Sequence, residues 1–277
     1  MLYSLTKFGA RLGIAAVLLL AQVCAAANDP DPNTEIWLKV KHSLFGDRSL
    51  MVDEAVLTLT TPYRAEDAAT VPVAIAVRMA QSDDRYVQKL YLIIDKNPSP
   101  IAAVFTLTPE SGRADIETRV RIEEYTHIRV IAELNNGELY SATRYIKAAG
   151  GCSAPAGKDV QAALARIGKM RFSVEKELGG HGLLQAQLMI SHPNFSGLAM
   201  DQLTRTYTPA HYVRSVNISF AGKPILSADV DFSISENPNF RFYLNAGAEG
   251  ALRAEVVDNK DLRFESSMII GGERVTQ

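Results

Sequence analysis

The stretch Val71-Pro72-Val73-Ala74-Ile75-Ala76-Val77-Arg78-Met79 alternates large apolar side chains with smaller or polar ones. Side chains of a β-strand point to opposite faces in turn, so a period of two places one row on a core and the other toward water. The stretch therefore predicts a half-buried strand. The same period recurs at three other places in this part of the chain, namely Leu57 and Leu59, then Leu90, Leu92 and Ile94, then Ile128, Val130, Ala132 and Leu134.

Turn signals separate these apolar runs. Asn136-Gly137 stands just before the run at residues 139–146, and this pair favours a tight hairpin in which both turn residues have positive φ. Residues 34–45 fit either a short helix or an edge strand. Many short strands without a long helical pattern predict an all-β, immunoglobulin-like sandwich for residues 28–147.

The strand pattern resumes after a segment rich in glycine and alanine. Alternating apolar positions follow at Ala186, Leu188 and Ile190, at Val216, Ile218 and Phe220, at Val230, Phe232 and Ile234, at Phe240, Phe242 and Leu244, and at Leu252, Ala254 and Val256. We expect a second sandwich over residues 170–277. Residues 148–169 are then a connecting arm with a short helix, which Asp159 can cap and Gly168 can end.

The first 27 residues have the features of a secretory signal peptide. Lys7 and Arg11 supply the positive region, and residues 12–20 form an apolar run too short to span a bilayer. Ala25-Ala26-Ala27 then offers a cleavage site of small residues. We expect residues 1–27 to be removed during export to the periplasm.

Loss of the signal peptide leaves 250 residues, and Cys152 is their only cysteine. A lipid on Cys24 is the alternative, but Val23 stands where a lipidation signal requires a small residue. In an oxidising compartment, a cysteine without a partner in its own chain is a free thiol or forms a disulfide with another molecule.

The charge balance excludes two classes of partner. The processed chain carries 27 basic and 31 acidic residues, a net charge of −4. No basic surplus is available to hold nucleic acid or an anionic membrane surface. No second apolar run reaches membrane-spanning length. The sequence therefore predicts neither a nucleic-acid partner nor a membrane association.

Cys152 lies among small residues, in Gly150-Gly151-Cys152-Ser153-Ala154. A structural buried cysteine usually belongs to an apolar strand or helix. Flanking glycines let a backbone enter a narrow channel and add no bulk beside the sulfur. The sequence predicts an exposed thiol on a mobile arm. No histidine or helix N-terminus adjoins it, so we expect a carrier position on which other enzymes act, not an autonomous catalyst.

Other chemical patterns are weak. His181, His192 and His211 lie 11 and 19 residues apart and lack the close spacing of a structural zinc site, so we expect no metal and no cofactor. Asp83-Asp84 and Glu123-Glu124 are expected to be solvated charges. The sequence has no nucleophile elbow, phosphate-binding loop or dinucleotide fingerprint, so it predicts no enzymatic activity of its own.

Several short motifs follow one another along both halves. In order they are Pro62-Tyr63-Arg64-Ala65-Glu66, Val71-Pro72-Val73, Asp95-Lys96-Asn97-Pro98-Ser99-Pro100, Gly150-Gly151-Cys152, His192-Pro193, Pro209-Ala210-His211-Tyr212-Val213, Gly222-Lys223 and Ser235-Glu236-Asn237-Pro238. With these motifs the chain resembles SoxY followed by SoxZ, the two subunits of the carrier in thiosulfate oxidation, fused into one polypeptide.

The resemblance implies that Cys152 holds sulfur-containing intermediates covalently on a flexible arm formed by Gly150, Gly151 and Ser153. It also implies that a SoxZ-like half packs against a SoxY-like half, and that periplasmic Sox-type or quinoprotein and cytochrome oxidoreductases are the partners. Two features depart from the family pattern. Ser153-Ala154 replaces the second glycine pair, and the arm is tethered at both ends. The fused form is similar to carriers found beside quinoprotein alcohol dehydrogenases.

Two other functions fit the same residues. The chain can be a non-catalytic accessory module of a periplasmic quinoprotein alcohol dehydrogenase, in which Cys152 is incidental. Alternatively, Cys152 can link two copies of the chain in a dimer.

Overall fold

The computed structural model describes residues 29–155, 160–176, 182–200, 204–247, 249–271 and 274–276. The expected signal peptide at residues 1–27 lies outside these ranges, as do Asp159 and His181. Within the described part, no helix has both the length and the apolar character that crossing a membrane requires. Residues 31–277 cluster as a single unit.

Residues 35–45 form a helix rather than an edge strand. This helix, α1 (Glu35–Phe45), begins where the Thr34 hydroxyl accepts a hydrogen bond from the main-chain N–H of Trp37 at 3.2 Å, and it ends at Gly46, whose φ is 59°. A side-chain acceptor at the N-cap satisfies one of the free N–H groups of the first turn. Trp37 and Phe45 are buried against Ile131 in a small apolar cluster.

Within the described ranges, the first half contributes seven strands, and the second half contributes eight. The first seven are β1 (Leu57–Thr60), β2 (Val71–Val77), β3 (Val87–Ile94), β4 (Ile101–Leu107), β5 (Ile116–Val120), β6 (Thr126–Leu134) and β7 (Leu139–Ile146). The others are β8 (Met170–Lys176), β9 (Leu183–Ile190), β10 (Val213–Phe220), β11 (Lys223–Val230), β12 (Asn239–Asn245), β13 (Gly250–Asp258), β14 (Arg263–Gly271) and β15 (Arg274–Thr276). A short 3-10 turn, Pro109–Ser111, precedes β5.

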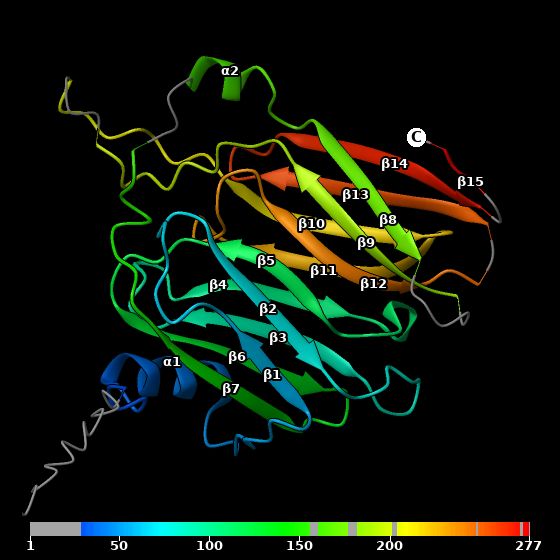
Figure 1. The fold of residues 1–277 in the computed structure, drawn as a ribbon, viewed down its shortest axis with the longest axis horizontal. Coiled ribbons are helices and arrows are strands. Elements are labelled where there is room, and N and C mark those ends of the chain that lie inside the picture. Colours follow the sequence, from blue (N-terminus) through cyan, green and yellow to red (C-terminus); the bar gives the residue numbers. More distant parts are fainter. Residues whose placement is uncertain are drawn as a thin grey trace, which may run out of the picture. The chain divides into compact units, whose positions relative to one another are not determined.

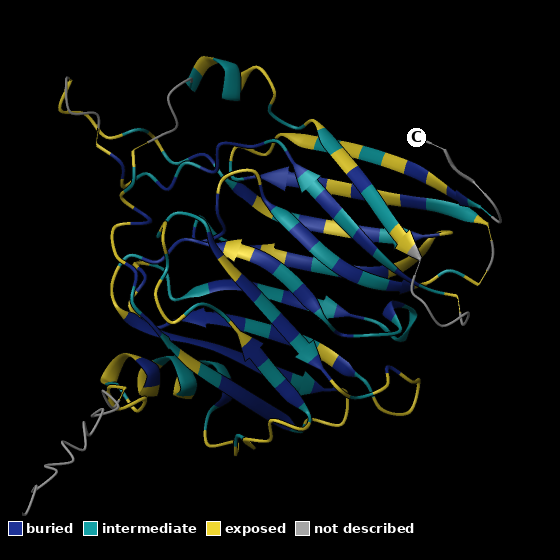
Figure 2. Cartoon of the chain, in the orientation of Figure 1, coloured by how far each residue is buried: buried dark blue, intermediate teal, exposed yellow. Residues whose placement is uncertain are grey.

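The apolar period of two places side chains as the sequence predicts. In β2, Val71, Val73, Ile75 and Val77 are buried, and the residues between them are partly or fully exposed. β9 alternates in the same way, and Figure 2 shows this banding along many strands. All strand pairs within the sheets are antiparallel. The predicted all-β class is confirmed, with two antiparallel sheets.

Both sheets are shared by the two halves of the chain. One sheet has the order β1-β2-β5-β12-β9-β8, and the other has the order β15-β14-β13-β10-β11-β4-β3-β6-β7. In the larger sheet, β4 and β11 pair over five positions, from Ala103 opposite Val230 to Leu107 opposite Leu226. Figure 1 shows β4 and β11 side by side. In the smaller sheet, β5 and β12 meet at Glu117 opposite Arg241.

The apolar core is continuous across this junction. One cluster of buried side chains extends from Leu57 to Ile270, and the ring of Phe105 on β4 packs edge-on against that of Phe240 on β12, with centroids 6.0 Å apart. The sequence suggested two sandwiches, each with its own core. The structure joins them, because β4 pairs its free edge with β11 and an unpaired edge strand would leave its main-chain groups exposed.

Two local expectations differ from the structure. Four residues, 135–138, connect β6 to β7, and Gly137 is the one of the Asn136-Gly137 pair with positive φ (88°). A four-residue connection does not need the two-residue turn in which both positions are left-handed. The run ending at Ile234 is also not a single strand, because β11 ends at Val230 and the main-chain N–H of Ile234 turns back to the Asp231 carbonyl at 3.0 Å.

The expected linker helix is present as α2 (Val160–Leu164). Gly168 follows it with a φ of 80°, a conformation that favours glycine. None of the residues of α2 is buried.

Candidate functional site

The cysteine-bearing segment, residues 147–153, is hydrogen-bonded along its length to the first half. After β7, the N–H of Lys147 donates to the Tyr63 carbonyl at 2.8 Å. The N–H groups of Gly150 and Gly151 then donate to the carbonyls of Glu123 and Ile122, both at 2.8 Å. The segment therefore lies along the loop that follows β5, instead of projecting from the molecule.

Cys152 is buried, with 1% of its surface exposed, and its thiol is free. The sequence-based expectation of an exposed thiol is wrong for this conformation. The prediction failed because it considered only neighbours in sequence, whereas the residues that cover Cys152 come from distant parts of the chain. Ser153, the next residue, is exposed.

The two glycines of the segment are needed for different reasons. Gly150 has a φ of 81°, and a Cβ there would meet nothing within 4 Å. At Gly151, a Cβ would lie 2.0 Å from the carbonyl oxygen of Ala68 and 2.8 Å from the amide nitrogen of Ile122. Gly151 thus permits close packing of three backbone segments, a role that differs from the flexibility expected from the sequence.

The Glu123 carboxylate binds the main chain around Cys152. Its Oε2 accepts the N–H of Cys152 at 2.9 Å and the N–H of Ser153 at 3.1 Å, and its Oε1 accepts the Ser153 hydroxyl at 2.8 Å. The N–H of Glu123 donates to the Asn97 side chain at 3.0 Å. The expectation that Glu123 is a solvated charge is wrong, because its carboxylate satisfies three donors of the cysteine-bearing segment.

The second half of the chain covers Cys152 from the other side. Ser196 lies in the connection between β9 and β10, and its hydroxyl donates to the Cys152 carbonyl at 2.5 Å. The main-chain N–H of Leu198 in turn donates to the Ser196 oxygen at 3.1 Å. Cys152 therefore lies at the junction of the two halves, bound to both.

Arg121 spans the same junction. Its side chain is buried, and Nη1 donates to the carbonyls of Asn194 at 2.8 Å, Phe232 at 2.9 Å and Ile234 at 2.9 Å. The Asn97 side chain donates to the Arg121 carbonyl at 2.8 Å. The loop after β5 is therefore fixed to the second half by hydrogen bonds to main-chain atoms.

The surroundings of the thiol keep it protonated. Burial raises the pKa of Cys152, the negative charges of Glu123 and Asp231 raise it further, and the positive charge of Arg121 lowers it, with a net value of about 12. A thiol must ionise to act as a nucleophile. In this conformation Cys152 is an unreactive thiol, and chemistry at its sulfur requires the segment to move.

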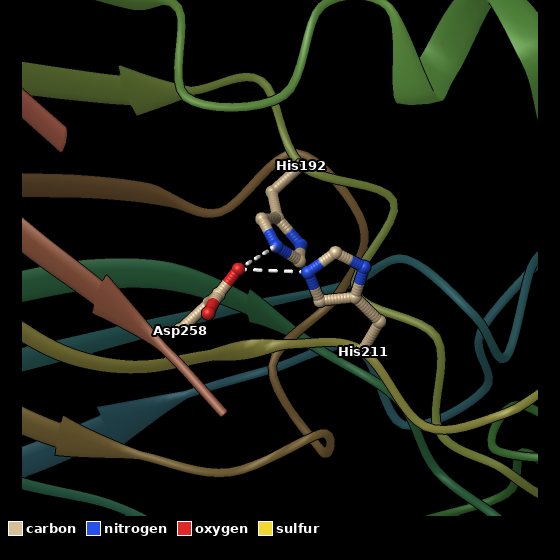
Figure 3. A group of neighbouring side chains, drawn as sticks. All are labelled: His192, His211 and Asp258. Carbon is tan, nitrogen blue, oxygen red and sulfur yellow. Dashed lines mark hydrogen bonds and ion pairs between the residues drawn. The ribbon is translucent and has the colours of Figure 1, made fainter. Parts of the chain in front are cut away.

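A separate cluster of three buried side chains lies in the second half of the chain. Figure 3 shows His192, His211 and Asp258 with both imidazole rings directed at one carboxylate oxygen. His211 Nε2 is 2.7 Å from Asp258 Oδ2, and His192 Nε2 is 3.6 Å from the same atom. The rings meet edge to face with centroids 4.8 Å apart. The sequence spacing gave no indication of this cluster, because the two ends of the β9–β10 connection and the last residue of β13 are brought together only by the fold.

Among the described residues, these three side chains offer nitrogen and oxygen atoms close enough together to be considered as metal ligands. However, His192 Nδ1 accepts the main-chain N–H of Asn194 at 3.0 Å, so a neutral ring carries its proton on Nε2. A metal ligand usually donates from its second ring nitrogen instead of accepting there. The separation of His211 from Asp258 is also that of a hydrogen bond. These residues fit a metal ion poorly, and we interpret the cluster as a buried polar contact between the β9–β10 connection and the end of β13.

The cluster also has a defined charge state. Burial lowers the pKa of His192 to about 4, assisted by the neighbouring His211. Burial alone would raise the pKa of Asp258, but hydrogen bonds from His211 and from the main-chain N–H groups of Leu262 and Lys260 bring it below its ordinary value. His192 is therefore neutral and Asp258 is charged near neutral pH.

Sequence reasoning identified Cys152 but missed the side chains that surround it. Glu123, Arg121 and Ser196 were not singled out for this role, since none belongs to a recognisable catalytic pattern. A weak signal existed, because two of the motifs quoted above, Asp95–Pro100 and His192-Pro193, lie in loops that contribute to the junction.

Comparisons with known proteins divide the chain at the cysteine-bearing segment. Residues 41–152 match the family model described as sulfur oxidation protein SoxY, and residues 172–268 match that of sulphur oxidation protein SoxZ. Among curated proteins, none matches the chain.

Solved structures give weaker likenesses. The sulfur carrier protein SoxY from Chlorobium limicola f thiosulfatophilum is 24% identical, over 40% of this chain and 89% of its own, with a TM-score of 0.34. A superoxide reductase (neelaredoxin) from Ignicoccus hospitalis is 12% identical, over 35% of this chain and 94% of its own, with a TM-score of 0.31. The two tandem V-type regions of VCBP3 are 11% identical, over 78% of this chain and all of theirs, with a TM-score of 0.24.

The two family matches agree with the motifs and with the division of the fold. SoxY is by family a sulfur carrier without catalytic activity, and the two halves pair within one chain through β4 and β11. The chain is a SoxY domain fused to a SoxZ domain, and it belongs to the SoxYZ family of sulfur carriers.

Proposed function

We propose that this protein is a periplasmic carrier that holds a sulfur-containing group covalently on Cys152 and presents it to partner oxidoreductases. The observation that supports this role most directly is the position of Cys152. It is the last residue of the SoxY match, it follows Gly150-Gly151, and it lies where the SoxY and SoxZ halves meet.

The carrier has two states in this proposal, docked and released. The docked state is the one described above, in which Glu123 and Ser196 hold the main chain of Cys152 and the thiol is neutral. In the released state these hydrogen bonds break and the thiol enters a partner's active site. Few side chains hold the segment, so release does not require either sheet to open.

Loading forms a disulfide-type bond between the Cys152 sulfur and a sulfur atom of the cargo. Joining two such sulfurs releases two electrons, together with the proton of the thiol. A partner oxidoreductase, of Sox type or a quinoprotein with its cytochrome, takes the electrons. To restore the thiol, a partner oxidoreductase first oxidises the sulfur bonded to Cys152 and takes its electrons. Water then attacks that oxidised sulfur, the sulfur–sulfur bond breaks, and Cys152 leaves as the thiol.

The test is mass spectrometry of the protein isolated from the periplasm of its native host during growth on reduced sulfur compounds. We expect added mass on the peptide that contains Cys152, and its removal by a thiol reductant. Cys152→Ser is expected to fold normally and to abolish oxidation of the sulfur compound.

Two outcomes contradict the carrier function. If Cys152 is unmodified under all growth conditions and Cys152→Ser leaves the pathway intact, the protein is an accessory module. If the added mass is a second copy of the same chain, the cysteine serves to form a dimer.

A further inference from the structure

Arg121 is a buried cation at the junction with no acidic partner among the residues that the structure describes. Only 8% of its surface is exposed, and its three hydrogen bonds all go to neutral main-chain carbonyls. Burial lowers the pKa of Arg121. A buried guanidinium without a counter-charge is unfavourable, so buried arginines are normally paired with carboxylates.

Arg129 provides a comparison within the same molecule. It is equally buried, and it binds Asp95 through two nitrogens, Nε to Oδ1 at 2.8 Å and Nη2 to Oδ2 at 2.7 Å. Arg121 uses Nη1 for all three of its contacts, which leaves the corresponding Nε and Nη2 edge without a partner in the described residues. That edge is the part of a guanidinium that matches the two oxygens of an oxyanion.

The cysteine-bearing segment lies next to this arginine. Ile122, the residue after Arg121, accepts a hydrogen bond from Gly151, the residue before Cys152. Asn194, which accepts from Arg121, belongs to the same loop as Ser196, which donates to Cys152. The sulfur is close enough that its ionised form would raise the pKa of Arg121, as the charges of Glu236 and Asp67 also do.

In an empty carrier no described anion contacts Arg121 directly, because the docked thiol is neutral and Glu236 and Asp67 act on the guanidinium without an ion pair. We propose that Arg121 is the anion-binding residue of the docked carrier and pairs with a negatively charged terminus of the group on Cys152. This inference rests on the proposed carrier function and narrows its cargo to small adducts that end in an anion, such as an oxyanion on sulfur. A neutral adduct of the same size leaves Arg121 unpaired.

Two alkylating agents give adducts of nearly equal size and different charge. Iodoacetate attaches a carboxymethyl group, and iodoacetamide attaches a neutral carbamidomethyl group. In both reactions the thiolate displaces iodide, a carbon–sulfur bond forms, and the thiol proton passes to the buffer. Each product is checked by mass for a single label on Cys152, and its melting temperature is then measured by circular dichroism at pH 7.

We expect the carboxymethyl form to melt roughly 5 °C above the carbamidomethyl form, because one charge-assisted pair shifts a domain of this size by a few degrees. This difference in melting temperature should vanish in Arg121→Met. It should shrink but persist in Arg121→Lys, because lysine keeps the positive charge but lacks the two-nitrogen edge of the guanidinium. Arg119→Met is the matched control. Arg119 lies two residues earlier and is exposed, so its loss should leave the difference unchanged.

A second measurement requires no change at Arg121. With carbon-13 iodoacetate, the carboxyl of the adduct can be titrated by NMR, and we expect its pKa to lie below that of carboxymethylcysteine in a peptide. Equal melting temperatures, a difference that survives in Arg121→Met, or an ordinary carboxyl pKa each overturns the proposal. These outcomes differ from the result that would contradict the carrier function itself. That result is an unmodified Cys152 in protein isolated from the native periplasm.

Discussion

At the residue scale, Glu123 controls how well the thiol is hidden. Its carboxylate accepts three hydrogen bonds from Cys152 and Ser153, and its charge raises the pKa of the thiol. Both effects stabilise a closed, protonated state. Access to the sulfur is therefore set by a side chain that belongs to a different strand connection, 29 residues earlier in the chain.

Replacing Glu123 should expose the thiol. In Glu123→Ala we expect Cys152 to react with a chromogenic disulfide at least tenfold faster at pH 8, because the lost hydrogen bonds are each worth about 1 kcal/mol or more. The measurement is the rate of release of the coloured thiol. Glu124→Ala is the control, since Glu124 is exposed and its carboxylate faces Lys96 at 3.7 Å. Equal rates in both variants would show that Glu123 does not hold the segment.

The two glycines should respond differently to substitution. Gly151→Ala places a methyl group against the Ala68 carbonyl, so we expect loss of docking and rapid thiol labelling. Gly150→Ala meets no atom but has a φ of 81°, so we expect only the strain of a left-handed residue, about 1–2 kcal/mol. Comparison of labelling rates and urea unfolding for the two variants checks this order, and a larger effect at Gly150 would contradict the close packing of Gly151.

At the element scale, the β9–β10 connection meets the end of β13 at His192, His211 and Asp258. Neutral His192 and charged Asp258 suit the buried contact near neutral pH. The segment that carries His192 also carries Asn194 and Ser196, which bind Arg121 and Cys152. Stability of this cluster is therefore linked to the shape of the junction around Cys152.

Acid should weaken this contact in a defined range. The unfolded chain binds a proton at His192 below about pH 6.5, whereas the folded chain does so only near pH 4. The unfolded state thus holds more protons between these values, and stability falls as pH decreases from 6.5 to 4, by up to roughly 3 kcal/mol. Urea unfolding across this range measures the slope. His192→Gln should flatten it, and His42→Gln, on α1, should not.

The cluster should also be independent of metal. Prolonged dialysis against a chelator is expected to leave the melting temperature unchanged, because His192 Nδ1 accepts a hydrogen bond and its proton occupies Nε2. A fall of several degrees, reversed by zinc or another transition metal, would show that the rings rearrange to bind an ion.

At the scale of the whole molecule, the two halves form one folding unit. They share both sheets and one apolar core, and the site lies where they meet. An independent SoxZ half would expose the edge of β11 and the ring of Phe240, and isolated edges of this kind promote aggregation. Fusion keeps the two partners at a fixed ratio and places the cysteine-bearing segment permanently beside the second half.

Separation of the halves should therefore destroy the fold of each part. We expect residues 29–155 and 160–277, expressed as separate chains, to be insoluble alone and to assemble when produced together, as judged by co-elution on a sizing column. Phe105→Ala should destabilise both halves in one cooperative transition, by about 3–5 kcal/mol. Two transitions, with only the first half affected, would indicate independent domains.

The sequence by itself determined the strand content and the division into two β-rich halves, and it singled out Cys152. These are local properties, since the alternation at residues 71–77 and the glycines before Cys152 can be seen in a short window of sequence. The shared sheets, the burial of Cys152 and the grouping of Arg121, Glu123 and Ser196 were decided only by the tertiary structure. Strand edges pair with any compatible edge, and burial depends on residues far away in the chain, so neither could be derived from neighbouring residues.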